Sequence, residues 1–208
     1  MNARLAAASL WLPPWTLRRE LERVAAATTS VLDSLLDQHL PGALGAIRRD
    51  EVPQRGSLRR RRTALAAAHT MRVARLVELL GRDEGIGEAR RALFAAGVAL
   101  GEEARQSLGV GENRRELLCA ARILYRVLGI RFRAEWRTPD EATVRIDRCA
   151  LANGYSPEAC LALSATDAGV VAGLWPGARL EFDERITEGK RACVARLSFP
   201  EARSEAVQ

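Results

Sequence analysis

The sequence predicts an α+β fold, in which N-terminal helices pack with a C-terminal ββαββ antiparallel sheet unit. Up to Gly129, apolar residues recur at spacings of three and four, which is typical of amphipathic helices. After Gly129 they alternate with charged residues, as in half-buried strands. We expect a single domain over 1–208, made of a helical part (1–129), a cysteine-bearing part (130–200) and a flexible tail (201–208).

The helical part contains four predicted helices, each bounded by capping or turn residues. Ser57 and Asn113 are N-cap residues, and Pro41-Gly42 and Gly81 end the helices that precede them. Glu116 follows Asn113 at the spacing of a capping box. The expected helices cover 16–39, 58–80, 87–108 and 114–128.

The cysteine-bearing part contains two strands, a helix and two more strands. Apolar residues at every second position define the strands, and Ser156 and Pro176-Gly177 bound the helix. Antiparallel strands joined this way form a sheet with its helices against one face. The strands pass through Phe132, Ala134 and Trp136; through Val144 and Ile146; through Leu180, Phe182 and Ile186; and through Cys193, Ala195, Leu197 and Phe199.

The composition limits the partners that we expect. Hydrophobic residues make up 48% and charged residues 28%, which is ordinary for a soluble globular protein. The net charge is +6, but apart from Arg59–Arg62 the arginines are scattered among carboxylates, and aromatic residues reach only 5%. We therefore expect neither a nucleic acid nor a membrane as partner. The apolar run Leu5–Leu12 stops at Pro13-Pro14, so we expect no cleaved leader and a cytoplasmic protein.

Four cysteines are present, with no Cys-x-x-Cys pair, and we expect them to be reduced. Cys119 lies among apolar helical residues and fits a core position. Cys149 ends the second strand, Cys160 lies near the start of the following helix, and Cys193 has the inward parity of the last strand. These last three cysteines can converge near one end of the sheet.

Cys160 lies where a thiol can be activated. With Ser156 as N-cap and Pro157 first in the helix, the positive end of the helix favours the thiolate and lowers the pKa of the Cys160 thiol, which a charged Glu158 opposes. The alternative is a small buried apolar residue.

Two further positions join the candidate site. Ser164 and Asp167 follow Cys160 at spacings of four and three, so all three share one helix face. This face either opens onto a pocket or leaves Asp167 at a solvent-exposed edge. His69 interrupts an apolar helix stripe, so it is either a core histidine or, beside the cysteines, a general base.

A metal site is the alternative use of the cysteines. Cys149, Glu158, Cys160 and Cys193 would make a set of ligands for zinc or another thiophilic metal. Their spacing matches no compact metal-binding motif.

The C-terminal third resembles the family of L-2-amino-thiazoline-4-carboxylic acid hydrolases. The resemblance covers about residues 125–200 and rests on Cys149, Ser156-Pro-Glu-Ala-Cys160, Asp167-Ala-Gly-Val-Val-Ala-Gly-Leu174 and Gly189-Lys-Arg-Ala-Cys193. The sequence departs from the family pattern at Ala150 and Lys190. A more distant similarity is to vinyl-4-reductase-like domains of sensors, which can carry a cysteine-rich zinc site.

The resemblance implies a hydrolase that opens a carbon–nitrogen bond of a small cyclic substrate. Cys160 would then act as nucleophile, with Cys149 and Cys193 lining the site and Asp167 assisting with protons. Ser164 and His69 would contact the substrate, and an arginine near the sheet would hold a substrate carboxylate. The alternative is a non-catalytic module that binds a metal or a small ligand.

Overall fold

The computed structural model describes residues 3–41, 56–111 and 113–199, and it confirms the α+β fold. The expected tail at 201–208 and the loop at 42–55 lie outside the described residues. In chain order the elements are α1 (Ala3–Leu10), α2 (Pro14–His39), α4 (Leu58–Leu80), α5 (Arg82–Leu108), α6 (Arg114–Leu128), β1 (Ile130–Thr138), β2 (Glu141–Cys149), α7 (Pro157–Leu174), β3 (Arg179–Glu184), the 3-10 helix η2 (Ile186–Glu188) and β4 (Cys193–Ser198).

Most helix boundaries follow the predicted caps. The Ser57 hydroxyl accepts the Arg60 N–H at the start of α4, and Gly81 ends that helix. One detail differs from the expectation. Helix α5 begins at Arg82, directly after Gly81, instead of near residue 87. The carboxylate of Glu116 accepts the N–H of Gly111 at 2.9 Å, and Asn113 Oδ1 accepts the N–H of Arg115 at 2.9 Å.

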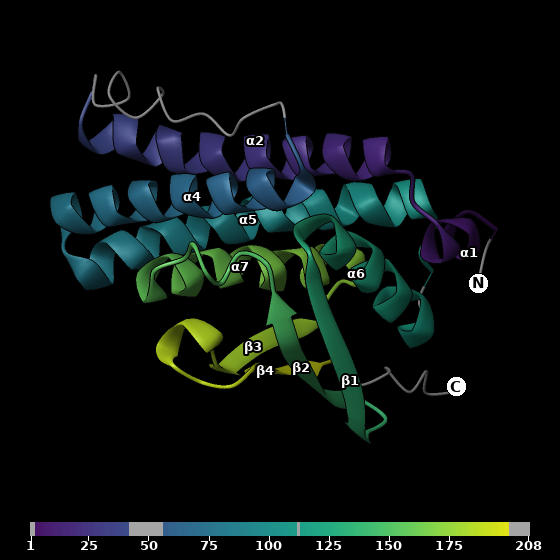
Figure 1. Cartoon of the computed structure of the whole chain (residues 1–208). Helices are drawn as coiled ribbons and strands as arrows, with labels where there is room; N and C mark the ends of the chain where they lie inside the picture. Colours follow the sequence, from purple (N-terminus) through teal and green to yellow (C-terminus); the bar gives the residue numbers. More distant parts are fainter. Residues whose placement is uncertain (1–2, 42–55, 112, 200–208) are drawn as a thin grey trace, which may run out of the picture.

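The sheet has the strand order β1-β2-β4-β3, and all neighbouring strands are antiparallel. Helix α7 lies between this sheet and α5, and α4 and α2 follow on the far side (Figure 1). Ile186, which we expected in a strand, lies in η2, because the chain leaves β3 after Glu184. Within the described residues, none of the helices has an apolar stretch that could span a bilayer.

The inward parity of the central strands is confirmed. Val144 and Ile146 of β2 are buried, as are Cys193, Ala195 and Leu197 of β4. These side chains form one apolar core with residues of α6 and α7. The alternation therefore directs one face of the sheet, Cys193 included, toward the helices.

Helices α5 and α7 meet through their backbones, at two glycines on each helix. Gly97 and Gly101 of α5 lie against Gly169 and Gly173 of α7. A Cβ atom at Gly169 would lie only 2.2 Å from the carbonyl oxygen of Phe94, which is far closer than van der Waals contact allows. The absence of side chains at this crossing brings α7 unusually close to the helical layer.

Replacement of Gly169 by alanine should therefore destabilise the protein. The new methyl group has to push two backbones apart, and we expect a loss of about 1–3 kcal/mol in the free energy of unfolding, measured by urea denaturation. Gly87→Ala in α5 is the matched control, because its Cβ would meet only the end of the Arg91 side chain at 3.6 Å. The control should be neutral or slightly stabilising. Equal effects of the two substitutions would contradict the backbone contact.

Candidate functional site

A buried cavity lies between α7, α4 and the sheet, and it unites all of the predicted catalytic and substrate-binding positions. Its volume is about 70 Å³, against roughly 10–15 Å³ needed for one water. We call it the cysteine cavity. It is lined by 21 residues, among them Cys149, Cys160, Cys193, Ser164, Asp167 and His69.

Three elements deliver the three cysteines to this cavity. Cys149 is the last residue of β2, and Cys193 is the first residue of β4. Cys160 follows the helix start at Pro157, where the Ser156 hydroxyl accepts the Ala159 N–H at 3.1 Å. The predicted convergence is thus a consequence of the antiparallel register and of where α7 begins.

The thiols are not activated in the way that the helix start suggested. Burial raises the pKa of Cys149 to about 11 and also raises the pKa values of Cys160 and Cys193. The positive charge of Arg185 acts in the opposite direction on Cys160 and Cys193 and does not overcome burial. Desolvation outweighs the helix terminus, so the three thiols are protonated at neutral pH.

The predicted metal ligands do not assemble. Within the described ranges, no group of three or more His, Cys, Asp and Glu side chains is placed to hold a metal ion. Glu158 is not among the residues that line the cavity, and its carboxylate lies 3.4 Å from Arg82 Nε. Cys149, Cys160 and Cys193 therefore do not form a ligand set by themselves, and Glu158 is directed toward Arg82 of α5 instead of joining them.

His69 is a buried, hydrogen-bonded residue of the cavity wall. Its Nε2 lies 2.8 Å from Thr28 Oγ1, and its Nδ1 lies 2.9 Å from the Tyr155 hydroxyl. Since the Thr28 hydroxyl donates to the carbonyl of Val24, it accepts from Nε2–H, and Nδ1 accepts from Tyr155. Burial, with a contribution from Arg72, lowers the pKa of His69 to about 3. With both ring nitrogens engaged, His69 positions Tyr155 and is a poor general base.

Asp167 is the group in the cavity with a pKa close to neutral pH. Burial raises the pKa of its carboxyl from 3.8 to about 7, although the Tyr125 hydroxyl donates a hydrogen bond that favours the ionised form. Such a pKa is the one expected of an effective general acid or base at neutral pH. Asp167 faces the cavity, and the alternative of a solvent-exposed edge position is wrong.

Arg185 supplies the positive charge of the cavity. It is 9% exposed and lies at the start of η2, where its Nη2 reaches Ser164 Oγ at 3.4 Å. Its Nη1 lies 3.6 Å from the Glu188 carboxylate. Its Nε has no hydrogen-bond partner among the residues that the structure describes. A desolvated N–H donor of this kind is costly unless something binds it.

A second cavity adjoins the first. It has a volume of about 80 Å³, and its wall is mainly apolar apart from Glu20, Arg23, Thr166 and Asp167. Thr166 and Asp167 line both cavities, and the Thr166 hydroxyl has no hydrogen-bond partner in the described part of the chain. The two cavities together give an apolar space with polar groups at their junction and at the Arg185 end.

Three polar residues of the cysteine cavity system were missed by sequence reasoning. Tyr125 and Tyr155 flank the predicted strands and helix, but no spacing links them to Asp167 or His69. Arg185 is one of many arginines, and the expectation of an arginine near the sheet did not identify it. Its position one residue after β3, followed by a turn, was the signal in the sequence.

The comparisons with known proteins assign no family. The sequence matches no family model, and it matches none of the curated proteins with which it was compared. Among solved structures, it is similar to a trafficking protein particle complex subunit 3 from Naegleria fowleri, covalently bound to palmitic acid in that crystal structure. The sequence identity is 13% and the TM-score 0.48, with 67% of this chain and 95% of that chain covered. A likeness this distant shows neither a family nor a function.

The Asp167→Asn substitution should make the protein more stable at high pH. Because the folded-state pKa of about 7 exceeds the ordinary value of 3.8, the native carboxyl keeps a proton that the unfolded chain has lost. Its contribution to stability is present below pH 4 and is lost as the pH rises to about 7. Relative to the native protein, the variant should gain on the order of 2–4 kcal/mol between pH 4 and pH 8.

The comparison between variant and native protein is needed because His69 acts in the opposite sense. Its depressed pKa gives stability that is present above pH 6.5 and lost as the pH falls toward about 3. Urea denaturation of both proteins across this range isolates the Asp167 contribution. Asp183→Asn, at an exposed carboxylate of β3, is the control and should leave the pH profile unchanged. An Asp167→Asn profile parallel to that of the native protein would refute the raised pKa.

Proposed function

We propose that this chain is a small-molecule-binding protein whose ligand occupies the cysteine cavity. The ligand we infer is mainly apolar and carries one anionic group, such as a carboxylate. The observation that carries the proposal is the Nε of Arg185, a buried donor without a partner among the described residues at the wall of an apolar cavity. This chemistry corresponds to the small-ligand alternative drawn from the sequence, without its metal.

The physical argument combines charge and desolvation. A guanidinium in apolar surroundings attracts an anion much more strongly than it would in water, and its planar N–H groups match a carboxylate. The Glu188 side chain is 39% exposed and its carboxylate lies 3.6 Å from Nη1 of Arg185, so it leaves Nε for a ligand. The apolar wall then selects the remainder of the molecule by shape and burial.

The proposal predicts that octanoate binds more tightly than octan-1-ol. The two molecules have the same apolar chain and differ in the charged group that Arg185 recognises. We expect a preference of about tenfold or more for octanoate, which corresponds to one hydrogen bond to a charged group. Ligand-observed NMR titration at pH 6 measures both affinities, because Asp167 is then mostly protonated while octanoate is ionised.

The Arg185→Met substitution should remove this preference while octan-1-ol still binds. Arg91→Met is the matched control, because Arg91 is an exposed residue of α5 with a side chain 75% exposed. The control should bind both molecules like the native protein. If the native protein binds octanoate and octan-1-ol equally, or if the control also loses the preference, Arg185 is not the anion-binding group.

A hydrolase that opens a small cyclic substrate is the second candidate, and the near-neutral pKa of Asp167 favours it. Since the Cys160 thiol is protonated, a nucleophilic attack needs a base, and Asp167 has a suitable pKa. Seven residues of helix separate Cys160 from Asp167 by about 10 Å, so in such a reaction the thiol proton passes to Asp167 through cavity water and the sulfur attacks the ring carbon. The ring nitrogen leaves with a proton, and water then releases the product from Cys160.

The hydrolase candidate makes a kinetic prediction with 2-amino-thiazoline-4-carboxylate as substrate. Cys160→Ala should abolish the addition of one water to the ring, which mass spectrometry detects. Asp167→Asn should lower kcat/KM by about 10²- to 10⁴-fold, and the native kcat/KM should rise with pH through about 7 as the carboxylate forms. Cys119→Ala is the control, because Cys119 is not among the residues lining the cavity. Unchanged turnover in Cys160→Ala would exclude covalent catalysis by this residue.

A further inference from the structure

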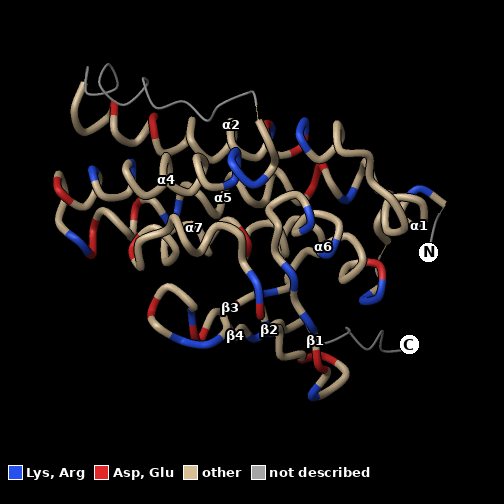
Figure 2. Tube along the Cα trace, viewed as in Figure 1, with Lys and Arg blue, Asp and Glu red and all other residues tan. Residues whose placement is uncertain are grey.

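We propose that a groove lined by six arginines binds closely spaced phosphate groups. This arginine groove is open to solvent and has a volume of about 1150 Å³, and it runs between the start of α4, the end of α6 and the Ile130–Cys149 end of the β1–β2 hairpin. Figure 2 shows basic segments of α4, β1 and β2 on the side that faces the viewer. The six arginines are Arg59, Arg62, Arg122, Arg126, Arg131 and Arg148.

The groove has a charge that the described protein does not neutralise. No Asp or Glu is among the 15 residues that line it. Arg62 and Arg126 are held by backbone carbonyls, because Arg62 Nε donates to Val127 at 2.9 Å and Arg126 Nη2 donates to Ser9 at 3.0 Å. Arg59 and Arg148 are exposed and form no ion pair within the described residues. An anion is therefore the missing partner of this surface.

The pairing of β1 with β2 adds a second, independent observation. Arg131 and Arg148 are direct cross-strand partners, an arrangement in which like charges repel each other. The same hairpin has another pair of arginines, Arg133 and Arg145, but there Asp147 lies between them at 2.7 and 2.9 Å. The repulsion is compensated outside the groove and left uncompensated inside it. An uncompensated cost of this kind is expected where the charges serve binding.

Phosphate fits these observations better than a single carboxylate does. Guanidinium groups bind phosphate oxygens through two parallel N–H bonds, and several of them together match several negative charges. A nucleic acid strand would need aromatic stacking platforms. The aromatic side chain that lines the groove, Phe132, is engaged edge-on by Tyr125 at 5.3 Å and lies under Arg122 at 5.8 Å. The groove therefore favours a compact oligophosphate over RNA.

The arginine groove and the cysteine cavity share a wall. Ile130 and Cys149, which are cross-strand partners, line both. The phosphate proposal rests on the groove alone and does not require the cavity to hold a ligand. Two sources of phosphate have the required chemistry, a free oligophosphate and the headgroup of an anionic lipid, and the experiment separates them.

The test measures tripolyphosphate binding by isothermal titration calorimetry at low and at moderate salt. The native protein should bind it with an affinity that falls steeply as salt rises. The variant Arg59→Gln/Arg131→Gln/Arg148→Gln should lose at least about tenfold in affinity, and about tenfold for each arginine that contacts phosphate directly. Its thermal stability should be unchanged or higher, because the repulsion between Arg131 and Arg148 is removed.

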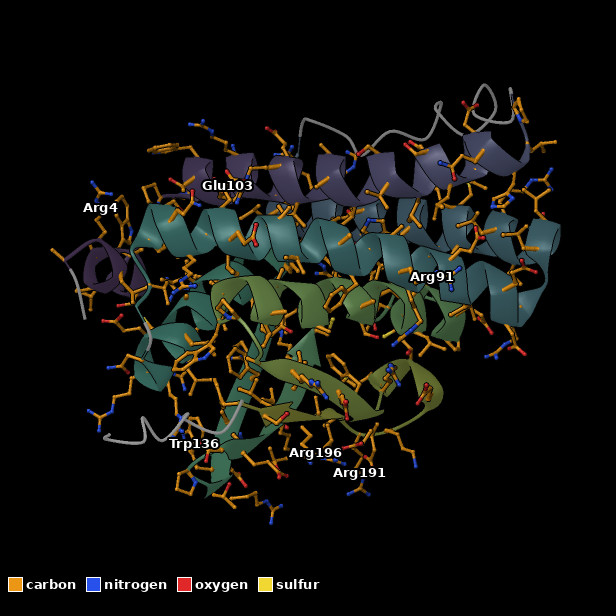
Figure 3. All side chains as sticks on the ribbon, turned by 180° about the vertical axis from the view of Figure 1, so that it is seen from behind. Arg4, Arg91, Glu103, Trp136, Arg191 and Arg196 are labelled. Atoms are coloured by element: carbon orange, nitrogen blue, oxygen red, sulfur yellow. The ribbon has the colours of Figure 1, made fainter. Side chains whose placement is uncertain are left out.

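The charge-matched control is Arg4→Gln/Arg91→Gln/Arg191→Gln, whose three positions lie on α1, on α5 and before β4, away from the groove (Figure 3). A second arm uses phosphatidylcholine vesicles doped with phosphatidic acid, with binding measured by sedimentation. If the groove variant loses tripolyphosphate binding and the control variant does not, the ligand is a free oligophosphate. If the groove variant loses vesicle binding and the control variant does not, the ligand is a lipid headgroup.

Three results would overturn the proposal. The first is an absence of native binding in both arms, and the second is an equal loss in the control and groove variants, which reports net charge alone. The third is tighter native binding of a single-stranded RNA oligonucleotide of matched charge than of tripolyphosphate. Octanoate binding is also measured in the groove variant, where Arg185 is intact and the octanoate affinity should be unchanged. This measurement separates a failure of the phosphate proposal from a failure of the small-ligand proposal.

Discussion

The backbone contact between α5 and α7 is the constraint on which the cavity depends. Gly169 and Gly173 place one face of α7 against α5, where no Cβ atom fits. At 100° per residue, Cys160, Ser164 and Asp167 lie on the opposite face, toward the cavity. Helix α7 is therefore covered on two sides, which explains why its sequence is rich in small and apolar residues all round. The sheet then forms the remaining wall of the cysteine cavity, to which it contributes Cys149 and Cys193.

Burial in this middle layer sets the electrostatics of the site. The same desolvation raises the pKa values of Asp167 and of the three cavity thiols and lowers the pKa of His69. In each case the neutral form is favoured. Arg185 is the exception, because a guanidinium keeps its charge in proteins. The cavity thus has a fixed positive charge among groups that resist ionisation, and this imbalance favours an anionic ligand.

The sequence was sufficient for features that depend on nearby residues. The N-cap at Ser57, the end at Gly81 and the inward parity of Cys193 all follow from local chemistry. The six positions predicted from helix spacing and strand parity also meet in one cavity. The metal site depends on the directions of the three cysteine side chains and of Glu158, which tertiary packing sets, and in the described residues these side chains do not form a ligand set. Arg185 was not identifiable, since its burial results from contacts between distant segments.

The glycines show the same limit in a different way. The pairs Gly97-x-x-x-Gly101 and Gly169-x-x-x-Gly173 can be recognised in the sequence, but their spacing does not indicate which helix each pair packs against. Only the structure shows that each pair is the partner of the other. The arginine groove follows the same rule, because its six arginines come from α4, α6, β1 and β2 and none of them stands out individually in the sequence. What the fold adds to the sequence is the combination of these residues: a desolvated charge inside the cavity, and an uncompensated cluster of charges beside it.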